Sequence, residues 1–128
     1  MMDTMDITTT TTDTTTQASH EELNRRVLAM ATQMLDLLRT FGREQITADE
    51  LVAALPEFAA EATLAQYWQQ LTEEPGLAAC FEVLQLLSSL ESEAGYQMLR
   101  YGPTSLHDDF RELTLAVARL QKTFQPGT

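Results

Sequence analysis

The stretch of residues 75–101 constrains the fold more than any other part of the chain, because its first half is apolar on nearly every side of a helix. The apolar residues of that half are Leu77, Ala78, Ala79, Cys80, Phe81, Val83, Leu84, Leu86, Leu87 and Leu90. The polar residues form only a narrow stripe, at Glu82, Gln85, Ser89 and Ser92. A helix with this pattern has to be surrounded by other helices. The sequence therefore predicts an all-α protein built around this segment.

The two ends of this central segment carry start and stop signals. Pro75 suits the first position of a helix, where no backbone N–H is needed, and the pair Gly102-Pro103 ends the helix. One alternative stays open, because Ser88 and Glu91 have the spacing of a capping box. A cap at Ser88 would divide the segment into two shorter helices.

A long amphipathic helix is expected on each side of the central segment. The first begins with a capping box of Ser19 and Glu22 and ends before Gly42, its predicted left-handed cap. Its apolar residues repeat at alternating spacings of four and three, as in a heptad seam: Leu23, Val27, Met30, Met34, Leu37 and Phe41. Leu28, Ala31, Leu35 and Leu38 widen this seam into the broader apolar face expected of a helix in a bundle. The last helix is capped by Thr104 or Ser105. It repeats the same spacings at Leu106, Phe110, Leu113, Val117, Leu120 and Phe124.

The region between the first helix and the central segment predicts two shorter helices. Thr47 and Glu50 form a second capping box, and Ile46 before it can pack on Leu51. Pro56 cannot lie in an undisturbed helix interior, so one short helix should cover residues 48–55 and the next should begin or kink at Pro56. This next helix is expected to end near residue 74, and its apolar face consists of Phe58, Leu64, Tyr67, Trp68 and Leu71.

Short connections between these helices favour antiparallel neighbours. We therefore expect residues 19–128 to form one domain, an antiparallel bundle of four to five helices. In the alternative, one heptad seam is an intermolecular surface and the protein is a homodimer. The six positions of each seam are fewer than the three to four heptads that indicate a coiled coil, which favours the intramolecular bundle.

Charge and cysteine content limit the classes of partner. The chain of 128 residues has 8 basic and 19 acidic residues and a net charge of −11 at pH 7. Binding to nucleic acid or to an anionic membrane requires clustered Lys and Arg residues that contact phosphates. Direct binding to either is therefore disfavoured for a chain with so few basic residues. Cys80 is the single cysteine, and neither a signal peptide nor a membrane span is evident. A reducing cytoplasm is the expected location.

The residue types present predict no catalytic, cofactor or metal site. His20 and His107 fall in the first turns of different helices, and one cysteine cannot anchor a zinc site. Neither histidine has a glutamate three residues before it, as a di-iron site in a bundle requires. There is no Gly-rich phosphate loop. The chain is therefore expected not to be an enzyme.

Acidic residues are concentrated in the middle of the sequence. Residues 44–99 contain ten acidic residues and no Lys or Arg. Such a surface either keeps a protein soluble or attracts a basic partner. Aromatic side chains within an acidic surface can anchor an interface. The predicted partner-binding residues are Glu57, Glu61, Tyr67, Trp68, Glu73 and Glu74.

These features favour a non-enzymatic protein that binds another protein through an acidic helical surface, as an adaptor, inhibitor or chaperone. In its small size, acidity and C-terminal amphipathic helix, the chain resembles the export chaperones of bacterial type III and flagellar secretion. The alternative is an acidic nucleic-acid mimic, a phage-type inhibitor whose carboxylates occupy a nucleic-acid-binding groove. An apolar groove would favour the first interpretation, and rows of carboxylates at phosphate-like spacing would favour the second.

Residues 1–18 form a Thr-rich acidic tail that is expected to be disordered, because it offers almost nothing to bury. We predict that deleting residues 1–18 leaves the thermal unfolding midpoint unchanged. A scan monitored by circular dichroism measures this midpoint. A decrease of more than a few degrees would make the tail a structural element.

Overall fold

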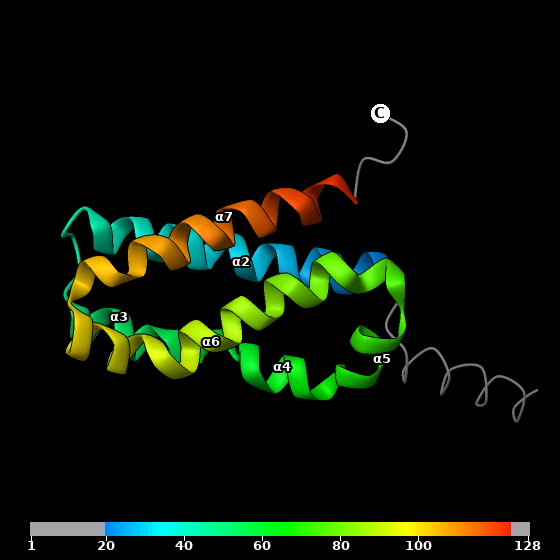
Figure 1. The fold of residues 1–128 in the computed structure, drawn as a ribbon, viewed down its shortest axis with the longest axis horizontal. Helices are drawn as coiled ribbons and strands as arrows, with labels where there is room; N and C mark the ends of the chain where they lie inside the picture. Colours follow the sequence, from blue (N-terminus) through cyan, green and yellow to red (C-terminus); the bar gives the residue numbers. More distant parts are fainter. Residues whose placement is uncertain (1–19, 124–128) are drawn as a thin grey trace, which may run out of the picture.

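The computed structural model describes residues 20–123, and the regular structure of this part of the chain is helical (Figure 1). The long helices are α2 (His20–Gly42), α6 (Ala78–Tyr101) and α7 (Leu106–Lys122). Between α2 and α6 lie α3 (Ala48–Ala54), η1 (Leu55–Phe58), α4 (Ala60–Gln66), α5 (Trp68–Glu73) and η2 (Pro75–Leu77). The turn η3 (Pro103–Ser105) joins α6 to α7. The predicted all-α bundle is confirmed, while the predicted tail and the Ser19 cap lie outside the described residues.

The chain runs up and down the bundle. Helix α2 runs from one end to the other, the row of short helices α3 to α5 returns, α6 repeats the direction of α2, and α7 returns again (Figure 1). Helix α6 packs against α2, α4 and α7, and α2 also packs against α7. Consecutive arms of the bundle are therefore antiparallel neighbours, as their short connections predict.

Helix α6 occupies the centre of the core. Its residues Val83, Leu84 and Leu87 are completely buried. Of the predicted polar stripe, Gln85, Ser89 and Ser92 are exposed and Glu82 is partly buried. The helix is continuous, so the alternative break at Ser88 does not occur. Ser88 is itself buried, and a break there would leave backbone polar groups without partners inside the core.

The buried face of α2 includes the residues that widen the predicted seam. Ala31, Leu35 and Leu38 are buried, whereas Met30 and Leu37 of the seam itself are only partly buried. A straight α-helix repeats about every 3.6 residues, so its buried face drifts away from a seam that repeats every 3.5. The apolar faces of both α2 and α7 are turned into the core of one molecule. A homodimer would therefore have to use another surface.

The returning arm of the bundle, which consists of the short helices from α3 to α5, has more interruptions than predicted. The Thr47–Glu50 capping box is confirmed, as is the short helix that ends before Pro56. The helix expected from Pro56 to residue 74 is interrupted at Ala59, which has a φ of 53°, and again at Tyr67. Each interruption redirects the backbone, so that α4 and α5 both follow the surface of α6.

The turn after α2 is closed by Glu44 and not by Gly42. The N–H of Glu44 donates to the carbonyl of Phe41 at 2.9 Å, and the N–H of Gln45 donates to the carbonyl of Thr40 at 3.1 Å. These are the two hydrogen bonds of a Schellman motif, whose left-handed residue is Glu44 with a φ of 60°. The predicted cap at Gly42 is therefore wrong, because α2 continues through Gly42 and its last carbonyls are satisfied further along the chain.

The start of α7 also differs from the prediction. The hydroxyl of Ser105 donates to the carbonyl of Gly102 at 2.7 Å and does not cap the free N–H groups of α7. The turn η3 leads directly into the helix. Asp108 and Asp109 occupy the first turn of α7, where the helix dipole favours negative charge.

The two glycines next to these turns allow a matched test of the backbone. Gly102 has a φ of 92° and a ψ of 164°, a region that only glycine adopts readily. We predict that Gly102→Ala lowers the free energy of unfolding by about 1 to 3 kcal/mol. Gly42→Ala should be neutral or slightly stabilising, because Gly42 is helical and an added Cβ meets no atom within 4 Å. Urea denaturation of both variants measures the difference, and equal effects would contradict these backbone assignments.

Candidate functional site

Two of the predicted binding residues, Glu61 and Trp68, lie together on a shallow groove between α4 and α6. This groove, which we name the Trp68 groove, has a volume of about 390 Å³. It is lined by Glu61, Leu64, Ala65, Trp68 and Ser88. The Trp68 side chain packs edge-on against Phe81, with 5.5 Å between the ring centroids, and is still 50% exposed. A half-exposed tryptophan beside an apolar groove is a typical interface anchor.

The other four predicted binding residues do not line this groove. The guanidinium of Arg26 in α2 lies over the Tyr67 ring, 6.0 Å from its centroid, so the two neighbouring aromatics contact different helices. Glu74 is partly buried and binds His20 at the start of α2. Glu57 and Glu73 are exposed, in η1 and in α5 respectively. The structure thus brings together only part of the predicted site.

Folding places basic residues beside the acidic middle of the chain. The carboxylate of Glu82 accepts two hydrogen bonds from Arg119 of α7, at 2.9 and 2.7 Å. This pairing raises the pKa of the Arg119 guanidinium above its ordinary value. Residues 44–99 contain no basic residue, but α2 and α7 pack next to this region. In the folded protein, basic side chains therefore lie beside its acidic ones.

Glu91 of α6 caps α4. The N–H of Glu61 donates to Oε1 of Glu91 at 2.9 Å. The residue before α4 is Ala59, whose side chain cannot accept a hydrogen bond. A helix distant in sequence thus supplies the cap that α4 lacks, and the contact joins the two walls of the Trp68 groove. The pairing of Glu91 with Ser88 that the sequence offered as an alternative does not form.

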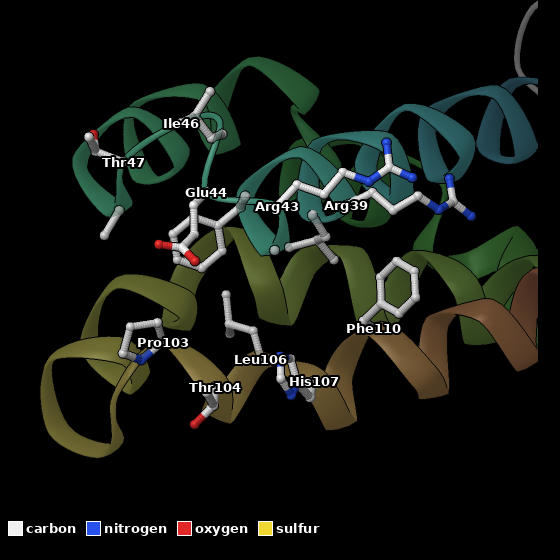
Figure 2. A pocket seen from close by; sticks show the side chains of 14 residues that line it. Arg39, Arg43, Glu44, Ile46, Thr47, Pro103, Thr104, Leu106, His107 and Phe110 are labelled. Atoms are coloured by element: carbon white, nitrogen blue, oxygen red, sulfur yellow. The ribbon is translucent and has the colours of Figure 1, made fainter.

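A larger hollow lies at the end of the bundle where α2 ends and α7 begins (Figure 2). This hollow, which we name the arginine cleft, has a volume of about 780 Å³. Its apolar wall is made by Leu38, Phe41, Ile46, Leu106 and Phe110. Its polar side chains are Arg39, Arg43, Glu44, Thr47, Thr104 and His107.

Sequence reasoning missed the arginine cleft, because its residues belong to two distant segments, 38–48 and 103–110. Taken alone, the first segment predicts only the end of a helix and the second only the start of one. The one available signal was the pair Phe41 and Phe110, which stand near the end of one seam and the start of the other. Antiparallel packing of α2 and α7 brings these two rings to the same end of the bundle.

The His, Cys, Asp and Glu residues of the described range do not gather into a metal site. Within residues 20–123, no cluster of three or more His, Cys, Asp or Glu side chains is placed to hold a metal ion. His20 and His107 lie at opposite ends of the bundle, because α2 and α7 are antiparallel. Burial raises the pKa of the Cys80 thiol to about 12, so this thiol stays neutral and weakly nucleophilic at neutral pH. No helix in this same range is long and apolar enough to cross a membrane.

Comparisons of the chain with known protein families, with curated proteins and with solved structures find no match. The described residues form an all-α bundle whose surface includes the Trp68 groove and the arginine cleft. One hollow is bordered by a carboxylate and a tryptophan, and the other is bordered by arginines.

The cap on α4 generates a stability prediction. Replacing Glu91 with Ala should lower the free energy of unfolding by about 1 kcal/mol, because the N–H of Glu61 loses its acceptor. Glu93→Ala is the matched control, since Glu93 is exposed on the same helix. Urea denaturation gives the stabilities, and hydrogen exchange at the Glu61 amide shows whether α4 opens first. Equal stabilities and equal exchange rates would contradict the capping role.

Proposed function

We propose that this protein is a non-enzymatic adaptor, inhibitor or secretion-chaperone-like protein that binds a partner with a basic surface at the Trp68 groove. The observation that carries the proposal is the half-exposed Trp68 on an apolar groove bordered by Glu61. Tryptophan is among the residues most often found as interface hot spots. Cys80 is buried and is not part of a disulfide, which suits a cytoplasmic location.

Exposed carboxylates on the same arm support a basic partner. Glu57, Glu61 and Glu73 are exposed, and none of them forms an ion pair within residues 20–123. Unpaired surface carboxylates attract a partner of opposite charge and accelerate association. The apolar groove then provides the contacts that slow dissociation.

The alternative, an acidic nucleic-acid mimic, has less support. A mimic requires rows of free carboxylates at the spacing of phosphates. In this part of the chain Glu82 is bound by Arg119 and Glu74 is bound by His20, which interrupts such rows. The Trp68 groove, which Glu61 borders, is lined mainly by apolar side chains, as expected of an adaptor.

The test is to capture partners on immobilised protein, identify them by mass spectrometry, and measure their affinity for variants. Trp68→Ala should raise Kd at least about tenfold, as expected for a hot-spot residue. Glu57→Gln with Glu61→Gln should slow association and flatten its salt dependence. Glu74 is left unchanged, because its replacement would also remove the contact with His20.

Matched controls for these variants are Tyr96→Ala, which removes another exposed aromatic ring, and Glu93→Gln with Glu112→Gln, which remove two exposed carboxylates elsewhere. Equal binding by the Trp68 and Tyr96 variants would overturn the proposal. If the captured partner binds nucleic acid and the wild-type protein displaces that nucleic acid, the mimic becomes the correct interpretation.

A further inference from the structure

The wall of the arginine cleft is apolar and open to solvent. Phe41, Ile46 and Phe110 are only partly buried, while Leu38 and Leu106 beneath them are buried in the core. Partly exposed apolar side chains around a hollow of about 780 Å³ favour a ligand that covers them. This volume lies in the upper part of the range of about 300 to 1,000 Å³ that is typical of binding pockets.

Two arginines border one side of the cleft: Arg39 lies in the last turn of α2, and Arg43 lies in the turn that follows this helix. The Arg39 guanidinium donates to Asp36 at 2.9 Å and lies over the Phe110 ring, 5.6 Å from its centroid, so it is held against the apolar wall. Arg43 has no ion-pair partner within the described range. Both arginine side chains extend to the same side of the cleft, away from the carboxylate of Glu44 (Figure 2).

This local charge contrasts with the charge of the whole molecule. The chain carries a net charge of −11, yet among the described residues that line the cleft Glu44 is the single acidic one, against two arginines. Asp36, outside the lining, offsets the charge of Arg39, so the positive charge that a ligand meets is chiefly that of Arg43. A ligand with carboxylates is repelled over most of the surface, whereas here Arg43 complements its charge. Arginine also binds carboxylates in a bidentate geometry, which adds orientation to the attraction.

We propose that the arginine cleft binds an acidic amphipathic helix of a second partner protein. Two or three large apolar side chains on one face of that helix enter the cleft and cover Phe41, Ile46 and Phe110. Carboxylates beside them pair with Arg39 and Arg43. This is the helix-in-groove mode of peptide recognition, in which apolar anchors recur at positions i, i+3 or i+4, and i+7. The cleft differs from the Trp68 groove in its position and in the charge of the ligand that it favours. The proposal for the cleft therefore does not depend on the proposed function of the Trp68 groove.

A designed peptide tests this proposal on the full-length chain. The probe is a fluorescein-labelled amphipathic helix of about 16 residues with Leu and Phe anchors at i, i+4 and i+7 and Glu at the flanking positions. One matched peptide has Lys for every Glu, and another has Ala for every anchor. Fluorescence anisotropy is measured on the Trp68→Ala variant as well as on the wild type, because the lysine peptide can bind at the Trp68 groove. In that variant it should show binding of the acidic peptide, at least about tenfold weaker binding of the lysine peptide, and no binding of the alanine peptide.

Charge reversal in the protein locates the site. Arg43→Glu should weaken binding of the acidic peptide at least about tenfold. Arg25→Glu makes the same change in net charge at an exposed position of α2 outside the cleft and should have little effect. Trp68→Ala should also leave peptide binding unchanged. In NMR titrations the methyl signals of Ile46 and Leu106 should shift, while the indole N–H signal of Trp68, the single tryptophan, should stay in place.

Several outcomes would overturn the proposal. Equal binding of the acidic and lysine peptides to the Trp68→Ala variant, equal effects of Arg43→Glu and Arg25→Glu, or shifts confined to Trp68 would each exclude an acidic ligand in this cleft. Binding that appears only after residues 1–18 are deleted would make the occupant the chain's own N-terminal segment. Binding of a fatty acid such as laurate, with no binding of the peptide, would make the cleft a site for small amphipathic acids.

Discussion

The burial of α6 on several sides is the constraint on which the rest of the bundle depends. Its side chains at Val83, Leu84 and Leu87 are removed completely from water, and each such burial contributes about 1.5 to 3 kcal/mol. This burial requires α2, α4 and α7 to cover different sides of the same helix. Once these helices are placed, their outward faces are available for binding.

Both proposed binding surfaces arise where the helices around α6 end or break. The interruption at Tyr67 separates two aromatic neighbours: Tyr67 lies under Arg26 of α2, whereas Trp68 packs on Phe81 of α6. The Schellman turn at Glu44 similarly ends α2 beside the start of α7 and leaves the arginine cleft between them. An adaptor with these two surfaces would hold a basic partner at one and an acidic helix at the other.

The distribution of charge illustrates how far sequence order differs from spatial order. Along the chain, residues 44–99 lack any basic residue. In the bundle, Arg119 binds Glu82, Arg26 covers Tyr67 and His20 binds Glu74, because the basic arms α2 and α7 lie next to the acidic arm and α6. The acidic surface that remains is smaller than the sequence suggests, and it includes Glu57, Glu61 and Glu73.

The sequence by itself determined the all-α class, the central place of α6, the capping box at Thr47 and the stop at Gly102. Each of these depends on side chains within a few positions of one another, where helix periodicity and capping are local. It also indicated that Glu61 and Trp68 belong to one surface. Only the tertiary structure decided the break at Tyr67, the cap that Glu91 provides for α4, and the arginine cleft. These features depend on residues about 30 to 70 positions apart, which only the packing of the helices brings together.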